Sequence, residues 1–307
     1  MKSTGKCWRL NDRILHDIKS EKEKCKKFTE KGAYTVWSLA VVQDNFNRGD
    51  TSHNVRLMES YIVSCARDHP QVKLILFPEL ATTGYRLTEK VKDVAEYAEG
   101  PTFSHLSALA QKFCLYIGYG FVEKGGASLP STFYNSMNFI GPNGERLATY
   151  QKIHLTPLEE HLFTPGRQLV TVDTEMGRFG LLICWDLAFP ELSRLLALEG
   201  ADVLLAPSAW EVPHDQSYRQ MASARALDNV VFVATCNHTG RTDDLKFFGK
   251  SAIYGPDGRT LNEANREGSG LVVSKIDLGV RQQMKEGFFS MWRDRRNDLY
   301  DVRWKGN

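Results

Sequence analysis

Residues 181–192 read LLICWDLAFPEL, an apolar run that reaches a cysteine and then turns polar. The run has the composition of a strand covered on both faces, and a helix is expected to begin near Pro190 after a short turn. A strand, a turn and a helix in this order can expose a nucleophile at the end of a sheet. Cys184 could also be a packing residue, but the Trp-Asp and Pro-Glu pairs after it do not continue a core strand. We therefore treat Cys184 as a candidate nucleophile.

Strand-like and helix-like segments alternate along the rest of the chain, which favours sheets covered by helices. PNG at 142–144 and PDG at 256–258 each predict a β-hairpin, and each hairpin closes a series of strand, helix, strand, helix and strand. The sequence thus predicts an α/β fold of two similar halves. Strands are expected at 35–43, 72–79, 115–123, 134–141, 145–152, 179–186, within 201–210 and at 230–238, and helices at 52–68, 101–113, 190–199 and 215–228.

Two further strand ends carry charged residues. Glu79 follows an apolar strand, at the edge where α/β sheets form ligand sites, and Gly84 permits a turn that directs this acid into a crevice. Lys152 ends the strand 145–152. Each residue alone is also compatible with a solvated charge, because carboxylates and lysines are seldom buried without partners.

The composition excludes several classes of protein. The chain has 307 residues, of which 42% are hydrophobic and 25% charged, and its formal net charge of +2 gives no electrostatic basis for a nucleic-acid partner. No run approaches the ~18 apolar residues that cross a bilayer. His154 and His161 lie seven residues apart with no nearby Cys or Asp, so we expect hydrogen-bonding histidines and no metal site. None of the six cysteines forms a CxxC pair, and reduced thiols are expected.

The N-terminal segment differs from the rest. Residues 1–33 hold ten of the 39 Lys and Arg but five of the 37 Asp and Glu, and they are expected to form a charged extension with a solvated helix. This segment lacks the apolar core of a signal peptide, so a cytoplasmic location is expected. We expect a single main domain over 34–300 and a tail over 301–307.

Three motifs occur in a characteristic order, namely FPEL (77–80), YQKIHL (150–155) and ICWDLAFPE (183–191). Over roughly residues 34–300 the chain resembles the nitrilase superfamily, the carbon–nitrogen hydrolases. The resemblance implies a four-layer α-β-β-α sandwich and a Glu–Lys–Cys triad, which falls on Glu79, Lys152 and Cys184. It also implies an acid before the TPG turn. The family spacing places that acid at Glu159, with Glu160 as the neighbouring alternative.

The resemblance implies a thiol hydrolase that cleaves a non-peptide carbon–nitrogen bond of a small amide, without metal or organic cofactor. Glu79 takes the proton of Cys184, the sulfur attacks the amide carbon, and Lys152 with the Trp185 N–H stabilises the oxyanion. Ammonia or an amine leaves, and water hydrolyses the thioester. Glu159 orients Lys152 or the leaving group.

Two positions bear on the substrate. Nitrilases typically carry Glu where this chain has Asp186, and carbamoylases and ω-amidases often carry Arg where it has Ala188. We therefore expect an amide whose acyl part is neutral or carries an amine. The alternatives are an N-carbamoyl amine or amino acid amidohydrolase similar to carbamoylputrescine amidases, a nitrilase, an acyltransferase, and a non-enzymatic interaction protein on the same scaffold.

Aromatic residues near the motifs are candidates for the substrate pocket, although most aromatics of such a chain are core. Relatives in the superfamily form dimers through the helix after the nucleophile, here residues 191–200, and often assemble further. We expect a homodimer or a higher homo-oligomer. The candidate substrate-binding residues are Tyr85, Trp185, Phe189 and Trp210.

Overall fold

The computed structural model describes residues 36–126, 128–129, 131–242, 245–265, 267–289 and 291–306. The charged extension expected over 1–33 lies outside these residues. Among the helices that are described, none is both long and apolar enough to traverse a bilayer.

One six-stranded sheet is built mainly from the first half of the chain. Its central strands β1, β2 and β3 are parallel, and the hairpin of β4 and β5 extends the sheet on one side. On the other side β14 pairs antiparallel with β1, from Val36 opposite Asp277 to Gln43 opposite Gly270. The strand order is β14 (Gly270–Asp277), β1 (Val36–Gln43), β2 (Val72–Leu76), β3 (Tyr116–Lys124), β4 (Phe133–Ile140) and β5 (Arg146–Gln151).

The second six-stranded sheet repeats this plan. Three parallel strands, β7, β8 and β9, are extended by the antiparallel strands β12 and β13, and β6 pairs antiparallel with β7. The predicted similarity of the two halves is therefore confirmed at the level of strand order. This order is β13 (Thr260–Glu263), β12 (Ala252–Tyr254), β9 (Phe232–Asn237), β8 (Val203–Ser208), β7 (Gly177–Leu181) and β6 (Thr171–Thr174).

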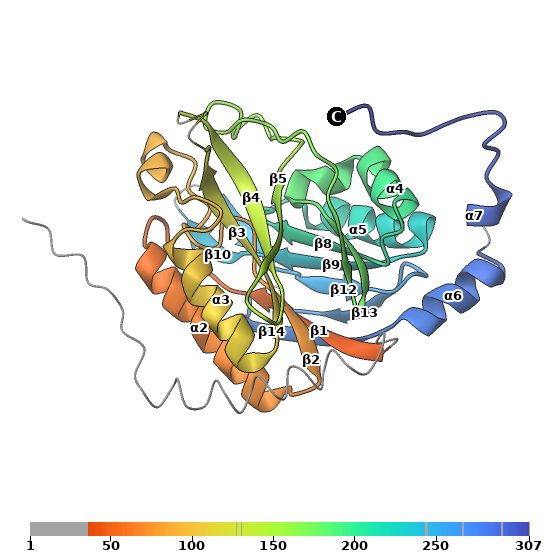
Figure 1. Cartoon of the computed structure of the whole chain (residues 1–307), viewed down its shortest axis with the longest axis horizontal. Helices are drawn as coiled ribbons and strands as arrows, with labels where there is room; N and C mark the ends of the chain where they lie inside the picture. The colour runs from red at the N-terminus through yellow and green to blue at the C-terminus, as the bar shows by residue number, and fades with distance from the viewer. Residues whose placement is uncertain are drawn as a thin grey trace, which may run out of the picture.

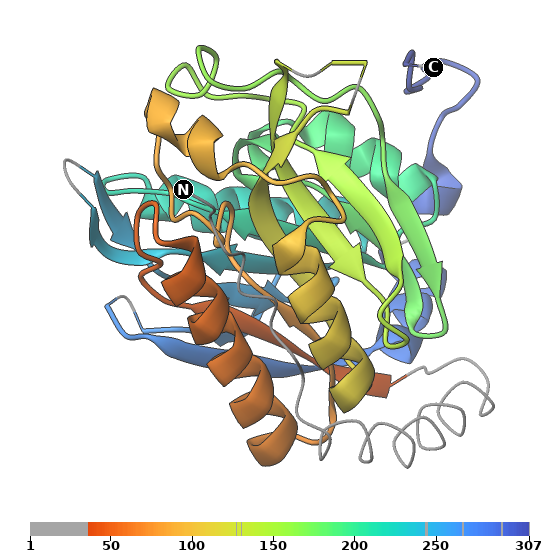
Figure 2. The ribbon, with the colours of Figure 1, turned by 60° about the vertical axis from the view of Figure 1, so that its left-hand side comes forward.

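Helices cover the outer faces of both sheets (Figures 1 and 2). Helices α2 (Thr51–Asp68) and α3 (Pro101–Phe113) pack on the first sheet, while α4 (Pro190–Leu198) and α5 (Asp215–Asn229) pack on the second. The expected α-β-β-α sandwich is thus confirmed. The remaining elements are η1 (Glu89–Val94), η2 (Cys184–Ala188), α6 (Leu278–Glu286), α7 (Met291–Asp294), and the hairpin of β10 (Thr239–Thr242) and β11 (Leu245–Phe248).

Two predicted strands end three or more residues earlier than expected, and both differences concern the candidate site. The strand predicted over 72–79 ends at Leu76, and the strand predicted over 179–186 ends at Leu181. In both places the apolar run continues beyond the last ladder residue because it is buried in a turn. The burial pattern alone does not distinguish a buried strand from a buried turn.

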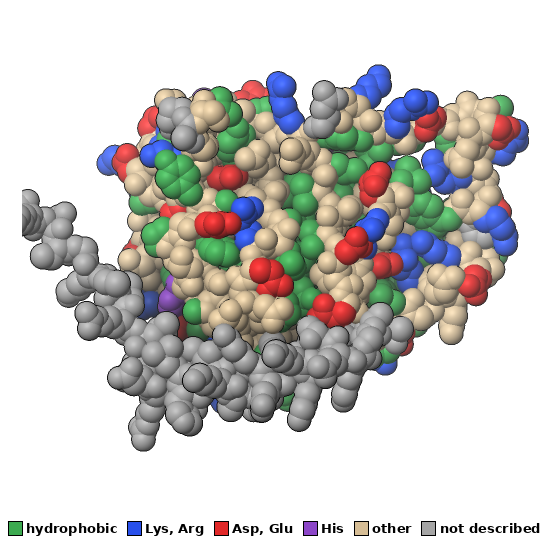
Figure 3. Space-filling model, in the orientation of Figure 1, with side chains coloured by type: hydrophobic (Ala, Val, Ile, Leu, Met, Phe, Trp, Pro, Cys, Tyr) green, Lys and Arg blue, Asp and Glu red, His purple; other side chains and the backbone are tan. Residues whose placement is uncertain are grey.

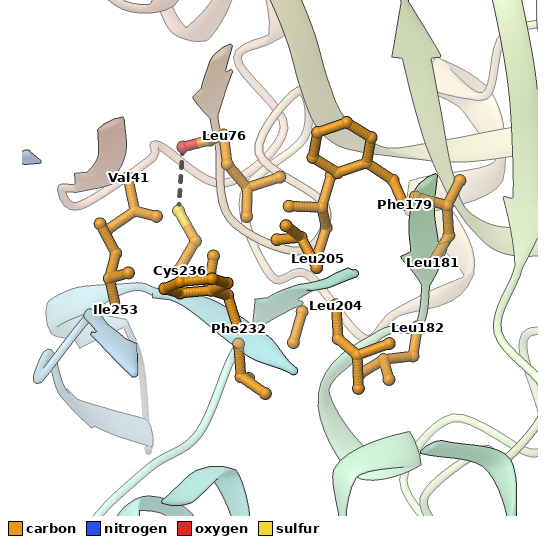
Figure 4. Packing of buried hydrophobic residues seen from close by; sticks show 14 of the residues in the cluster. Val41, Leu76, Phe179, Leu181, Leu182, Leu204, Leu205, Phe232, Cys236 and Ile253 are labelled. Atoms are coloured by element: carbon orange, nitrogen blue, oxygen red, sulfur yellow. Dashed lines mark hydrogen bonds between the residues drawn. The ribbon is translucent and has the colours of Figure 1, made fainter. Parts of the chain in front are cut away.

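The core between the sheets is formed by side chains of alternate strand residues. Leu39 and Val41 of β1 belong to this core, whereas Ala40 and Val42 belong to the core beneath α2 and α3. Figure 4 shows Phe179 and Leu205 within the inter-sheet core, and the Cys236 thiol of β9 directed at the Leu76 carbonyl of the first sheet. Cys236 Sγ lies 3.1 Å from that oxygen. The two sheets therefore share a continuous apolar interior.

We expect the Phe179→Ala variant to lower the free energy of unfolding by about 3–5 kcal/mol, because it leaves a cavity between the sheets. Phe179 is fully buried and contacts Trp37 and Phe139 of the first sheet at centroid distances of 5.7 and 5.3 Å. Urea denaturation measures the change. Leu261→Ala is the control, because Leu261 is 44% exposed on β13. Equal losses for the two variants would contradict this packing.

Candidate active site

Glu79 lies just beyond β2, in a turn held against β3. The Phe77 N–H donates to Gly118 O at 2.8 Å, and the Thr82 N–H donates to Gly120 O at 3.2 Å. A side chain at Gly120 would place its Cβ 2.4 Å from the Leu80 nitrogen, so only glycine permits this approach. The turn buries the Glu79 carboxyl completely instead of exposing it.

Lys152 follows β5 and is also fully buried, between two carboxylates. Its Nζ lies 2.7 Å from Glu79 Oε1 and 2.8 Å from Glu159 Oε2. Glu159 is fully buried, and its Oε2 also accepts the Thr156 N–H at 2.8 Å. Glu160 is exposed. Of these two neighbouring acids, Glu159 is the one that forms the ion pair with Lys152.

Asn135 joins the two carboxylates and was not predicted from the sequence. Its Nδ2 donates to Glu79 Oε1 at 2.7 Å and to Glu159 Oε1 at 2.8 Å. Asn135 lies on β4, and the Lys152 N–H donates to its main-chain oxygen at 2.8 Å. An asparagine inside a predicted strand carries no sequence signal of this kind. The strand also carries Ser136 and Asn138, so an amide at position 135 does not stand out in the sequence.

Burial and neighbouring charges separate the pKa values of the two carboxyl groups. Burial raises the pKa of Glu79 to about 7, with Lys152 opposing the shift and Glu159 adding to it. Burial also acts to raise the pKa of Glu159, but Lys152 and the hydrogen bonds from Thr156 and Asn135 outweigh it and hold this pKa below its usual range. Two acids sharing one cation thus have different proton affinities.

Cys184 approaches this cluster from the second sheet. It is the first residue of η2, lies beyond β7, and has φ 51°. This left-handed conformation costs a non-glycine residue on the order of 1–2 kcal/mol. Burial and the Glu79 charge raise the pKa of the Cys184 thiol well above its usual value, while Lys152 opposes the shift. The thiol is therefore protonated at rest and electrostatically coupled to both residues.

His238, which follows β9, supports Glu79 from behind. Its Nε2 lies 2.6 Å from the Glu79 main-chain oxygen, and its ring packs against Phe46 and Phe247. Burial lowers the pKa of His238 to about 4, so the neutral ring donates this hydrogen bond near pH 7. Nothing in the sequence distinguished this histidine.

The carbon–nitrogen hydrolase family model matches residues 38–286, which is most of the chain. The chain belongs to the carbon–nitrogen hydrolase family. A probable nitrilase of Schizosaccharomyces pombe is 36% identical over 86% of this chain and 97% of its own length. The 2-oxoglutaramate amidase of Bacillus subtilis is 32% identical over 86% and 99%, respectively.

A solved carbon–nitrogen hydrolase from Helicobacter pylori G27 has the same fold, with a TM-score of 0.81 and 26% identity. The alignment covers 87% of this chain and 97% of that chain. As a carbon–nitrogen hydrolase with amidase relatives, the protein is an enzyme that hydrolyses amide-type carbon–nitrogen bonds other than peptide bonds.

The four predicted substrate-binding aromatics form two groups in this hydrolase. Trp185 contacts Phe189 and Trp210 at centroid distances of 6.1 and 5.5 Å, next to the turn that carries Cys184. Tyr85 lies apart from them and packs against Phe247. Burial and the charges of Glu159, Glu79 and Cys184 raise the pKa of Tyr85 well above its usual value.

Other candidate groups have structural partners. His154 forms a hydrogen bond with Asp186, whereas His161 is exposed, and the described ranges contain no cluster of three or more His, Cys, Asp or Glu that could hold a metal ion. Cys65, Cys184 and Cys236 are free. The expectation of reduced thiols was wrong for Cys114, which is disulfide-bonded; its sequence spacing carried no indication of this.

The pKa of Glu79 predicts the pH dependence of hydrolysis. Because only an ionised carboxylate can accept a proton, a base at this position makes kcat/KM rise through about pH 7 and level off above it. Asn135→Leu removes a donor to both carboxylates and should move this limb to higher pH.

The matched control is Asn138→Leu, a buried asparagine of the same strand that donates to Ala98 O and Tyr119 Oη. Its limb should stay at the wild-type position. A limb that moves equally in both variants, or that lies near pH 4.5 in the wild type, would contradict Glu79 as the base.

Proposed function

We propose that this protein is a thiol amidase in which Cys184 is the nucleophile, Glu79 the general base and Lys152 the oxyanion stabiliser. The supporting observation is the convergence of a buried carboxyl, ammonium and thiol that come from both sheets. Glu159 holds and orients Lys152. Each residue type matches its role, since a thiol needs a neighbouring base and an amide oxygen needs a cation or N–H donor.

The first step is proton transfer from Cys184 to Glu79. Glu79 Oε1 is occupied by Lys152 and Asn135, whereas Oε2 is buried without a hydrogen-bond partner among the described residues. Oε2 is therefore the atom available to take the thiol proton. A pKa of about 7 lets Glu79 accept this proton and return it to the leaving amine.

The second requirement is stabilisation of the tetrahedral intermediate. Lys152 Nζ has three N–H donors and lies within hydrogen-bond distance of Glu79 Oε1 and of both Glu159 oxygens, so the developing oxyanion would replace one of the two contacts with Glu159. The main-chain N–H of Trp185, the residue after the nucleophile, is the second donor. Each well-placed donor contributes on the order of 3–4 kcal/mol to the transition state. Glu79 then activates the water that hydrolyses the thioester and releases the acid.

The substrate is proposed to be a small amide with a neutral or amine-bearing acyl part. Ala188 provides no guanidinium beside the nucleophile turn. The arginines that might act instead are engaged elsewhere: Arg194 donates to Asp228 O, Arg225 donates to Leu187 O, and Arg219 pairs with Glu263. A free guanidinium would be needed to bind a substrate carboxylate through two parallel hydrogen bonds.

Assembly as a homodimer or higher homo-oligomer and a cytoplasmic location are further parts of the proposal. The C-terminal segment supports assembly, since Phe288 is 94% exposed and Leu299 is 70% exposed. Acidic and basic side chains are interspersed on the face seen in Figure 3, which suits a small-molecule enzyme better than one that binds a polyanion. Light scattering measures the oligomeric state.

Cys184→Ser and Cys184→Ala should remain folded but lose kcat by about 10³-fold or more, because neither side chain supplies a thiolate. The assay is ammonia release from a simple amide, with circular dichroism as the check on folding. Cys65→Ala is the matched control, since Cys65 is a buried free thiol on α2. Full activity of either Cys184 variant would rule out the mechanism.

A substrate panel tests the acyl preference. We expect a higher kcat/KM for neutral monoamides than for monoamides of dicarboxylic acids, and Ala188→Arg should reduce that difference by supplying a guanidinium. N-carbamoyl amines and nitriles complete the panel, because the names of the relatives include both nitrilase and amidase. A wild-type preference for dicarboxylate monoamides would overturn the argument from Ala188.

A further inference from the structure

Asp186 is a fully buried carboxylate two residues after Cys184. Its Oδ2 accepts the Ile183 N–H at 2.9 Å and the Tyr150 hydroxyl at 2.7 Å. Its Oδ1 accepts the His154 main-chain N–H at 3.0 Å and lies 2.7 Å from His154 Nδ1. An ionised carboxylate only accepts, so the Nδ1 carries the proton in this contact. Both oxygens are therefore committed to protein donors.

These partners belong to two segments that are far apart in the chain. Ile183 immediately precedes Cys184, whereas Tyr150 and His154 lie two residues before and two residues after Lys152. Asp186 thus joins the segment that carries the thiol to the segment that carries the ammonium. The same carboxylate thus binds a residue on each side of Lys152 and the residue directly before Cys184.

The same residue holds the nucleophile turn. The Asp186 N–H donates to Ile183 O at 3.0 Å, while the Asp186 side chain accepts the Ile183 N–H. These two hydrogen bonds close the turn that contains Cys184, whose backbone φ is 51°. A non-glycine residue keeps this conformation only where its surroundings hold it.

The other end of the turn is fixed through aromatic contact. The Phe189 N–H donates to Asp186 O at 3.2 Å, and the Phe189 ring stacks on the His154 ring at a centroid distance of 3.7 Å and an interplanar angle of 10°. The His154 side chain, bonded to Asp186 through Nδ1, therefore also packs on Phe189, the residue that follows η2.

We propose that Asp186 is a positioning residue that fixes the Cys184 sulfur relative to the Lys152 ammonium by binding the flanks of both. It acts through Ile183, Tyr150 and His154 and does not touch the substrate. The proposal rests on the function proposed above for Cys184 and Lys152. It assigns Asp186 a role in the acylation step that goes beyond the stability of the fold.

Tyr150→Phe tests the link without changing a charge. The variant removes one hydrogen bond to Asp186 and keeps the buried ring, so we expect kcat to fall roughly tenfold with KM nearly unchanged. Tyr116→Phe is the matched control. Tyr116 is a buried tyrosine of the same sheet that donates to Glu175 Oε2 at 2.6 Å, at the start of β3 and away from the strand ends that carry the site.

The two tyrosine variants distinguish positioning from stability. Each loses one hydrogen bond between a tyrosine and a carboxylate, so similar decreases in melting temperature are expected, but only Tyr150→Phe should lose kcat. Equal kcat values in both variants would overturn the proposal, as would a loss of kcat in Tyr150→Phe that stabilising additives restore in proportion to the melting temperature.

Asp186→Asn provides a second test, because loss of the charge and loss of positioning would change the alkylation rate of Cys184 in opposite directions. Loss of a negative charge two residues from the thiol would by itself favour the thiolate and speed its alkylation by iodoacetamide. Loss of positioning lets Cys184 leave the position beside Lys152, so we expect alkylation at Cys184 to slow several-fold and kcat to fall roughly 100-fold. Faster alkylation with unchanged kcat would contradict the proposal.

Failure of this proposal is distinguishable from failure of the proposed function. Were Cys184 not the nucleophile, Cys184→Ala would retain activity whatever the result for Tyr150→Phe. Were Cys184 the nucleophile but Asp186 only a structural residue, Cys184→Ala would be inactive while Tyr150→Phe matched Tyr116→Phe in kcat.

Discussion

The Lys152 ammonium, buried between the carboxyl groups of Glu79 and Glu159, is the interaction on which the site depends. Removing three ionisable groups from water is costly, and the arrangement is tolerable because each group has close partners of opposite charge or hydrogen-bond donors. Two acids and one cation leave an excess of negative charge. Burial and that excess raise the pKa of Glu79 to about 7, which is the property that the proposed role of Glu79 as a general base at neutral pH requires.

The same constraint requires both sheets. Glu79 and Lys152 follow strands of the first sheet, and Cys184 follows β7 of the second. Their convergence therefore depends on the apolar interior that joins the sheets and on the Cys236 contact with Leu76 O. Glycine at position 120 permits the Glu79 turn to approach β3, and the left-handed conformation at Cys184 turns the second sheet's strand end toward it.

Local patterns in the sequence predicted the elements that depend on local interactions. The hairpins around PNG and PDG and the helices α2 to α5 were found because turn residues and periodicity are local signals. The strand β14 was missed, because its pairing with β1 joins opposite ends of the domain. Strand ends were misplaced where buried turns have the same apolar composition as strands.

The candidate site was predicted only in part. Glu79, Lys152, Cys184 and Glu159 were assigned by resemblance to the family, and the structure brings these side chains together. Asn135, His238 and the network of Asp186 were missed, because each acts through a partner 24 or more residues away that composition cannot identify. The family spacing favoured Glu159 over the adjacent Glu160, and in the structure Glu159 is buried against Lys152 whereas Glu160 is exposed.

The most direct test of the account is mass spectrometry of the enzyme quenched in acid during turnover of a small amide. A thiol mechanism predicts a mass increase equal to one acyl group, mapped to the peptide that contains Cys184 and lost once the substrate is consumed. An acyl group mapped to any other residue would contradict the central claim.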